Sequence, residues 1–503
     1  MKKIGAATAA LTLGLTAACG GGSSDVRTGD GLLKFGAVLA HSTLDPDLLP
    51  VAQMSPYLTP LYDTLTLLSP DESVEPLLAT EWESGEDGDG PYLDMTLRDG
   101  LSFPDGTPFT SETVIANIDR SQELEGSTNA VDFTGVTVEA TDTHRVRFRS
   151  EQGVGALPRI LAGPAGMMIS DEAIETGTDL TEQSAGIGSF TLDTVQPNRV
   201  VYKANDGYRD EGAAAAETLE IHYLADDAKL NAIRSGDLDI ALLPQQMVQT
   251  AEDSGYEIER SLGAENYTFS FNTEMEPFDD VRVREAVSLA LDQQAVCDSL
   301  LEGECEPTGQ FFGAGTNAYD PDLGLERFPF DLEKAKKLVK EAGAQGAEVE
   351  IVTVAGNQVF EQLATIVQAQ LTEIGLDAAV SPVAPPQVVS RFTAEKNVAM
   401  AFGATGNAFD PSVTLQRYGL VGGLYNPGGL EDPEVEELAK EALLETDQEE
   451  RSRIYREISG MYAESMLVVP VLTPESSYVI APGVEGWEAP WAPSFPSFRG
   501  VSD

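Results

Sequence analysis

Basic residues are scarce in this sequence. Its 503 residues include 31 Lys and Arg against 83 Asp and Glu, which gives a formal net charge of −52. Nucleic-acid binders need a basic surface to neutralise phosphates, and proteins held on anionic lipid headgroups need basic clusters. The composition therefore argues against both classes and indicates a solvated, self-repelling surface. Because 42% of the residues are hydrophobic, the chain can still build large cores.

Cysteine and histidine are also rare, with three of each. Such low counts exclude a disulfide scaffold, a zinc-ribbon array and a His-rich metal store. The sequence patterns H-E-x-x-H, G-x-S-x-G and G-x-x-x-x-G-K-[ST] do not occur either. We therefore expect a protein that is not an enzyme and that uses no cofactor and no metal.

The N-terminus has the pattern of an export signal. Two lysines precede an uncharged apolar stretch that ends at residue 18, and Cys19 follows before a Gly/Ser-rich run over 20–24. Small residues before a single Cys resemble a bacterial lipoprotein processing box. We predict that residues 1–18 are a signal peptide, that Cys19 is lipidated and that residues 19–31 form a flexible tether. No other run of 18 apolar residues occurs, so we expect an extracytoplasmic protein anchored to the cell membrane, at the cell surface or in the periplasm.

Export also bears on the two remaining cysteines. Cys297 and Cys305 are eight positions apart, across an expected helix end and a turn that contains Gly303. Oxidising surroundings outside the cytoplasm favour a local disulfide between them. Two free thiols are the alternative.

Strand patterns occur along most of the chain. Alternating apolar residues near 93–97, 136–138 and 146–148 predict half-buried strands, and the apolar run 467–472 predicts a strand buried on both faces. No composition typical of a linker separates the chain into domains. The chain is therefore either one large domain or a set of domains built from discontinuous segments, and the second arrangement is the usual way to make a hinge.

Helical patterns are clearest in the second half. Asp279 or Asp280 can cap one helix and Asp331 another, while Gly343 and Gly375 suit the ends of helices. Apolar residues recur there with the helical period. Helices with such an apolar stripe are predicted over residues 283–295, 335–342 and 360–374, and two acidic helices over 434–445 and 449–464.

Several short stretches carry a likeness to a known family. The most recognisable is LRDGLSFPDGTP at 97–108, and Phe409-Asp410-Pro411 is the last of the series. In chain order the stretches are 61–65, 76–83, 97–108, 111–114, 186–190, 235–240, 271–273, 277–286, 291–292 and 409–411. Together they resemble the extracytoplasmic solute-binding proteins of peptide-type ABC importers, family 5, which includes oligopeptide, dipeptide and nickel binders. The resemblance spans residues 32–487.

The resemblance implies an α/β fold of the periplasmic-binding-protein type. Two mixed-sheet lobes then surround a hinged cleft, and an extra subdomain is inserted in the first lobe. The implied division gives 32–45, 186–265 and 469–503 to lobe I, 46–185 to the inserted subdomain, and 266–468 to lobe II.

The resemblance also implies where a ligand lies. In this family the ligand often pairs its backbone with a short second-lobe strand, here residues 402–405, by β-augmentation. Dipeptide- and oligopeptide-type members follow this strand with an aspartate for the ligand's ammonium group, and here that role falls to Asn407 or Asp410. Asn407 supplies no charge, and residues 354–357 lack the arginine that dipeptide-type members use, so both departures argue against a dipeptide clamp. The expected ligand-binding residues are His41, Thr43, Tyr267, Asn272, Gly403, Ala404, Thr405, Asn407, Phe409, Asp410, Tyr425 and Asn426.

The expected function is that of a lipid-anchored receptor for an ABC importer. It would capture a short peptide or peptide-like solute and deliver it to the transmembrane permease subunits. A receptor for a nickel chelate or another small solute is the alternative on the same fold, and a secreted hydrolase is the alternative from another class. We expect a monomer that binds no nucleic acid.

Overall fold

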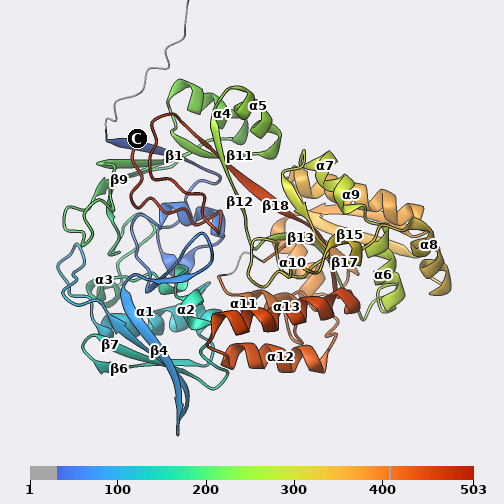
Figure 1. Cartoon of the computed structure of the whole chain (residues 1–503), viewed down its shortest axis with the longest axis horizontal. Coiled ribbons are helices and arrows are strands. Elements are labelled where there is room, and N and C mark those ends of the chain that lie inside the picture. Colours follow the sequence, from blue (N-terminus) through green and yellow to red (C-terminus); the bar gives the residue numbers. More distant parts are fainter. Residues whose placement is uncertain (1–30, 407–408) are drawn as a thin grey trace, which may run out of the picture.

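One large mixed sheet extends through both lobes of the molecule (Figure 1). The structure is a computed structural model that describes residues 31–406 and 409–503. The strand order is β16 (Asp377–Val383), β15 (Glu348–Val354), β17 (Met400–Thr405), β13 (Asn266–Phe271), β18 (Val468–Ile480), β11 (Ile240–Leu243), β1 (Leu32–Ala37), β10 (Thr218–Tyr223), β9 (Arg199–Ala204) and β8 (Phe190–Gln196). Two further strands, β12 (Glu257–Leu262) and β14 (Cys305–Pro307), also pair with β18.

Strand β18 belongs to both lobes. Its first part pairs with β13 between Val468 and Leu472, and its last part pairs with β11 and β12 up to Ile480. In Figure 1 it is the long red arrow between the two halves. The chain passes between the lobes again where β12 leads into β13, through residues 263–265. Two such neighbouring connections form a hinge.

Lobe I contains β1 and β8–β11, with α4 (Asp226–Ser235) and α5 (Val248–Asp253) packed beside them. The C-terminal segment completes its core, because Trp487 and Phe498 lie against Phe35 of β1 at ring-centroid distances of 5.8 and 5.2 Å. All three aromatic side chains are buried. The two ends of the described chain therefore meet in one lobe.

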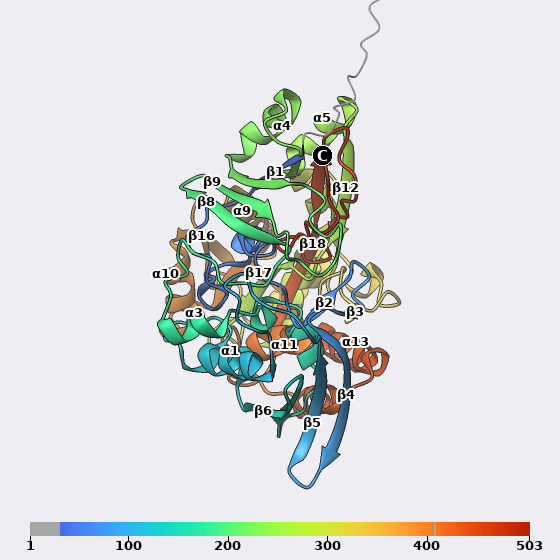
Figure 2. The same ribbon diagram turned by 90° about the vertical axis from the view of Figure 1, so that its left-hand side faces the viewer.

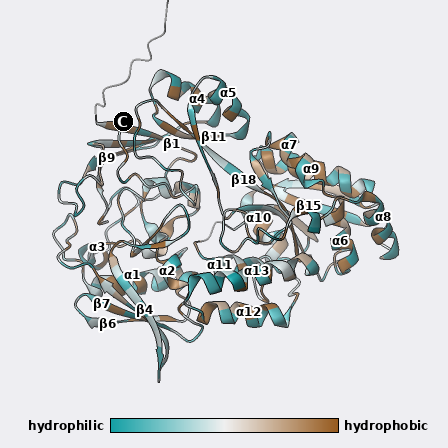
Figure 3. Cartoon of the chain, in the orientation of Figure 1, coloured by the Kyte–Doolittle hydropathy of each residue, from teal (hydrophilic) through white to brown (hydrophobic). Residues whose placement is uncertain are grey.

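Lobe II contains the other half of the large sheet and most of the helices. Acidic caps start several of them: Asp280, Asp331 and Asp447 each accept a hydrogen bond from a backbone N–H of the first turn. In Figure 3 several helices carry both hydrophobic and hydrophilic residues, as helices with one buried face do. The helices are α6 (Val281–Ala290), α7 (Gln293–Leu300), α8 (Leu332–Glu341), α9 (Gln358–Glu373), α10 (Pro385–Val389), α11 (Pro411–Tyr418), α12 (Pro433–Leu444) and α13 (Gln448–Ser465).

A smaller unit with its own sheet and core is inserted between β1 and β8. Its four strands are antiparallel in the order β4, β5, β7, β6, and Figure 2 shows the β4–β5 hairpin projecting from the body of the molecule. The elements are β2 (Thr66–Leu68), β3 (Val74–Pro76), β4 (Ala79–Asp87), β5 (Gly90–Leu97), α1 (Ser111–Glu123), β6 (Val136–Asp142), β7 (Arg145–Ser150), α2 (Leu157–Ile160) and α3 (Asp171–Thr176).

Several expectations from the sequence are confirmed. The predicted strands coincide with β5, β6 and β7, and four predicted helices coincide with α8, α9, α12 and α13. The helix predicted over 283–295 is instead two helices, because α6 ends at Ala290 and Asp292 caps α7. One expected element is longer than predicted: the apolar run 467–472 forms only the first part of β18, which continues to Ile480. The later part is more polar, and Pro474 to Ser476 are only partly buried where the strand crosses between the lobes.

The two cysteines of lobe II are joined. Cys297 of α7 and Cys305 of β14 form a disulfide with an S–S distance of 2.00 Å. The bond ties the end of a helix to a strand that pairs with β18, and it closes a loop of only eight positions.

Candidate functional site

Strand β17 presents an incompletely paired backbone edge. It pairs with β13 along its whole length, from Met400 to Thr405. On its other side it pairs with β15 only at Met400 and Ala401. Among the described residues, no strand covers the 402–405 edge on that side, and Ala404 O accepts a hydrogen bond from the Tyr418 hydroxyl at 3.3 Å. The remaining backbone groups of this edge can receive another strand.

A cavity of about 200 Å³ opens beside this edge. A Cβ atom built on Gly403 would meet no atom within 4 Å, so the space above the strand is open there. Tyr418 and Tyr425 form one wall, with rings stacked at 4.5 Å between centroids and 9° between planes. The other lining residues, mostly apolar, are Thr268, Ser270, Val354, Phe360, Pro385, Val388, Val389, Ala401, Phe402, Gly403, Ala404 and Thr405.

A second cavity, of about 190 Å³, lies at the crossing between the lobes. Glu265 and Tyr267 line it from the hinge and β13, and Phe35, Tyr478 and Pro493 line it from lobe I. Tyr267 is only 9% exposed, and its ring packs edge-on against Phe360 at 5.2 Å. Since Phe360 lines the cavity at β17, Tyr267 lies between the two spaces.

A third cavity, of about 390 Å³, separates lobe II from lobe I and its inserted subdomain. Phe409 and Arg417 line it from lobe II, and Asp132 lines it from the subdomain. The Phe409 ring lies 4.8 Å from Phe495 and 6.1 Å from Trp491, so it bridges to the C-terminal segment. Burial raises the pKa of Asp132 to about 6, and the positive charge of Arg417 partly opposes this.

Asp410 lies outside these three cavities and is fully buried. Its two oxygens accept hydrogen bonds from Arg451 at 2.8 and 3.0 Å, and Arg159 Nε lies 3.9 Å away. Although burial opposes ionisation, these two guanidinium groups hold the pKa of Asp410 below its usual value. The carboxylate also caps α11 by accepting the Ser412 N–H. Its hydrogen-bonding capacity is therefore used inside the protein.

Two other expected residues organise loops. The Asn426 amide donates to the carbonyls of Gly419, Leu420 and Leu430 and accepts the Leu430 N–H. Asn272 accepts the N–H of Glu274 at 3.2 Å. Both side chains are buried and line none of the three cavities.

The expected residues near the first strand lie apart from β17. Thr43 accepts the Asp45 N–H at 3.0 Å, and the His41 ring lies 5.4 Å from Tyr57. Burial lowers the pKa of His41. Neither residue lines one of the three cavities. Asn407 and Cys19 lie outside the described residues.

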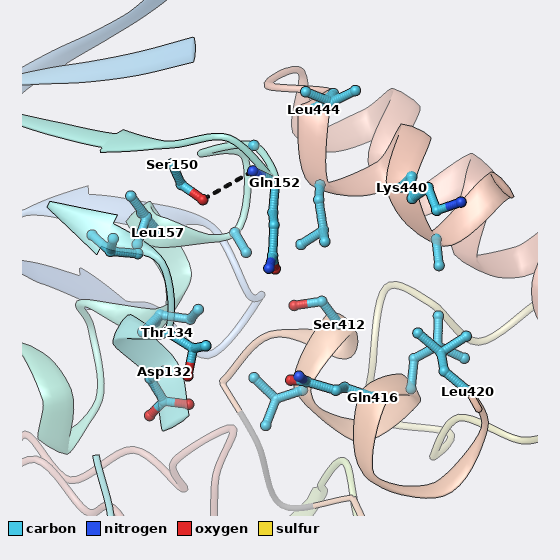
Figure 4. Close-up of a pocket in the computed structure, with 18 of the residues that line it drawn as sticks. Asp132, Thr134, Ser150, Gln152, Leu157, Ser412, Gln416, Leu420, Lys440 and Leu444 are labelled. Carbon is cyan, nitrogen blue, oxygen red and sulfur yellow. Dashed lines mark hydrogen bonds between the residues drawn. The ribbon is translucent and has the colours of Figure 1, made fainter. Parts of the chain in front are cut away.

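The sequence did not point to a further cavity of about 520 Å³, which lies between the inserted subdomain and lobe II. In Figure 4, Asp132, Thr134 and Leu157 approach it from the subdomain, and Gln416 and Lys440 approach from α11 and α12. These residues come from distant segments with no shared sequence pattern, so only the fold reveals the space.

The described part of the chain offers neither a metal-binding cluster nor a membrane-spanning helix. Residues 31–406 and 409–503 contain no group of three or more His, Cys, Asp or Glu side chains arranged to hold a metal ion. Over the same residues, every helix is too short or too polar to cross a membrane.

A two-lobed α/β fold with a hinge and cavities between its lobes defines a binding protein of the periplasmic type. The chain belongs to the family of bacterial extracellular solute-binding proteins, family 5, whose "Middle" region matches residues 73–425. Its relatives are binding proteins of transporters. The expected fold class and family are thereby confirmed.

Individual relatives resemble the chain over most of its length. The glutathione-binding proteins GsiB of Salmonella typhi and Escherichia coli (strain K12) are each 25% identical over 434 residues, 82% of this chain and 83% of theirs. NikA from Brucella suis in complex with Fe(III)-EDTA has a TM-score of 0.80 at 21% identity, covering 92% of this chain and 98% of that one. DppA from Helicobacter pylori in complex with the peptide STSA has a TM-score of 0.78 at 20% identity, covering 94% and 98%. At 20% and 21% identity, the similarity to these two solved structures shows a shared fold.

Proposed function

We propose that this protein is the ligand-capturing receptor of an ABC importer and that its ligand is a short peptide or peptide-like solute. The incompletely paired edge of β17 carries the proposal. An extended ligand that pairs with this edge gains main-chain hydrogen bonds whatever its side chains are. The similarity to GsiB and DppA, described as binding glutathione and the peptide STSA, supports a ligand of this class.

In this proposal the ligand lies along residues 402–405 between the lobes. Tyr267, Phe409 and Tyr425 supply apolar and aromatic walls, and Asn407 adds a neutral polar group. Asn272, Asp410 and Asn426 hold the surrounding loops, and His41 and Thr43 belong to the lobe I side of the cleft. Ligand binding favours the closed arrangement of the lobes, and the permease subunits recognise that arrangement.

Thermal stabilisation of the purified protein tests the ligand class. Glutathione and a tryptic digest of casein should raise the unfolding temperature by mass action, and the complex of nickel with histidine should not. Stabilisation by the nickel complex alone would favour the chelate-receptor alternative. Cleavage of the casein peptides, followed by mass spectrometry, would favour the secreted hydrolase.

A substitution at the strand separates binding at β17 from binding elsewhere. Gly403→Val places a branched side chain in the cavity and should abolish stabilisation by the peptides. Gly88→Val adds the same bulk at the tip of the β4–β5 hairpin, where a Cβ also meets no atom within 4 Å, and should leave stabilisation unchanged. Equal stabilisation of both variants and the wild type would refute the assignment to β17.

We also propose that the chain is exported and anchored through lipidated Cys19. In cells, Cys19→Ala should move the protein from the membrane fraction to the soluble extracytoplasmic fraction. Retention of the variant in the membrane fraction would contradict the anchor.

A further inference from the structure

The cavity at the crossing between the lobes contains a single charged side chain. Glu265 lines it, and of the described residues that share its walls none is Lys, Arg or His. The neighbouring walls are the aromatic rings of Tyr267 and Tyr478 and polar but uncharged groups such as Gln53 and Gln245. A negative charge therefore faces a small, mainly uncharged space.

The Glu265 carboxylate is half-buried and has no partner among the described residues. Within residues 31–406 and 409–503 it makes neither a hydrogen bond nor an ion pair. Two nearby hydroxyls are used elsewhere, since Tyr418 donates to Ala404 O and Tyr478 donates to Pro493 O. Burial raises the pKa of Glu265 to about 7. An unpaired carboxylate in such a position costs free energy that an approaching cation would recover.

Glu265 also lies beside the strand that carries the proposed ligand edge. It directly precedes Asn266, which pairs with Thr405 at the end of β17. A Cβ on Gly406 would overlap Ala264 O and lie 3.3 Å from Glu265 Cα, so the two segments are in backbone contact. Because side chains alternate along a strand, Glu265 and Tyr267 project from the same face, and Tyr267 packs on Phe360 of the β17 cavity.

We propose that Glu265 binds a cationic group of the ligand, an ammonium or a guanidinium, while the rest of the ligand extends along β17. The inference rests on the proposed function. A cavity of about 190 Å³ accommodates such a group but not a whole peptide, so the ligand occupies both spaces. The N–H groups of the cation donate to the carboxylate oxygens, and a charge-assisted bond of this kind is about twice as strong as a neutral one.

The test compares charged and neutral forms of the same ligands. A tryptic digest of casein is divided, and one half is acetylated so that its amines lose their charge. The untreated digest should stabilise the wild type against heat more than the acetylated digest does, in which only peptides that contain arginine keep a cationic side chain. In Glu265→Gln, which keeps the size of the side chain, the apparent affinity for the untreated digest should fall by about 10- to 100-fold. Glu265→Asp should retain part of the effect, because the charge is kept.

A matched control removes a charge outside the cavity. Glu257 is an exposed acid on the adjacent strand β12, so Glu257→Gln changes the net charge equally and should bind the digest as the wild type does. If Glu265→Gln and the wild type bind both halves of the digest equally, the inference is wrong although the peptide receptor stands.

A second set of probes keeps the two proposals distinguishable. Putrescine, choline and arginine are tested as cations that contain no peptide bond. Suppose that neither half of the digest stabilises the protein, whereas one of these cations stabilises the wild type more than it stabilises Glu265→Gln. Glu265 is then the cation site, and the proposal of a peptide ligand is wrong. If no probe distinguishes the wild type from Glu265→Gln, the inference is overturned.

Discussion

Two carboxylates near the cleft have opposite surroundings. Asp410 is enclosed by the guanidinium groups of Arg451 and Arg159, whereas Glu265 has no charged neighbour in the walls of its cavity. The same functional group is therefore stabilised as an anion in one place and destabilised in the other. This contrast separates a residue that holds the fold from one that is available to a ligand.

For Asp410 we predict a large loss of stability on neutralisation. Asp410→Asn leaves the buried guanidinium group of Arg451 without its anion, whereas Arg159 keeps Glu72 at 2.8 Å, and should lower the free energy of unfolding by about 3–5 kcal/mol. Urea unfolding followed by circular dichroism measures the change. The double variant Asp410→Asn, Arg451→Met should recover part of the loss, because it removes the unpaired charge of Arg451. A loss below about 1 kcal/mol in the single variant would contradict a structural role.

For Glu265 we predict a pH-dependent gain in stability on neutralisation. Its folded-state pKa of about 7 lies above the ordinary glutamate value, so its contribution to stability is complete at low pH and is lost as the pH rises through 7. The free energy of unfolding of Glu265→Gln should therefore exceed that of the ligand-free wild type by about 1–3 kcal/mol at pH 8. At pH 5 the difference should be much smaller. Thermal unfolding at both values measures this. Equal differences at both pH values would contradict the raised pKa.

The sequence could not identify Glu265 as a candidate. One glutamate among 83 acidic residues carries no signal, and its distinction is the lack of a partner, which only the packing of β13, α11 and the C-terminal segment decides. Asp410 illustrates the reverse case: its position in a family motif suggested a ligand contact. The charges that engage it, Arg159 and Arg451, lie 251 and 41 positions away in the chain.

At the level of elements, the sequence predicted helices better than strand partners. A helix starts where a capping residue precedes a helical pattern, so a few neighbouring residues are enough to recognise the start. The caps at Asp280 and Asp331 could be recognised from four or five residues each. Strand pairing depends on segments far apart, such as β13 and β18, which the alternation of apolar residues cannot match to each other. The resemblance to the family identified residues 402–405 as a strand that pairs with a ligand, but not its partner strands β13 and β15.

The disulfide between α7 and β14 should contribute measurably to stability. Cys297→Ser with Cys305→Ser removes a covalent link across a short loop, and we expect a loss of about 2–3 kcal/mol in the free energy of unfolding. Urea unfolding of the double variant measures it. As a control, a thiol-reducing agent should destabilise the wild type similarly and leave the double variant unaffected. A double variant as stable as the oxidised wild type would contradict the prediction.

On the scale of the whole molecule, the inserted subdomain touches lobe II directly. Gly155 N–H donates to Leu443 O at 2.9 Å, and Gln448 donates to Gly155 O at 3.4 Å. A Cβ on Gly155 would overlap Glu445 O, so only glycine permits this approach. The contact lies at the edge of the cavity in Figure 4 and holds the two units together. The residue boundaries assigned to the lobes in the sequence remain a prediction.

We therefore predict that Gly155→Ala favours a more open arrangement. The added methyl group should cost about 1–3 kcal/mol in the arrangement that contains this contact, and ligand binding should weaken if the ligand selects that arrangement. Small-angle X-ray scattering should show a larger radius of gyration, and titration calorimetry with glutathione a lower affinity. Gly88→Ala, on the exposed hairpin, is the control. An unchanged radius and affinity would show that this contact does not govern closure.

Strand β18 has a consequence for how the protein melts. Each lobe needs part of the same continuous strand to complete its sheet, so neither can lose its order while the other keeps all of its own. Scanning calorimetry should accordingly record one main heat-absorption peak for the two lobes together.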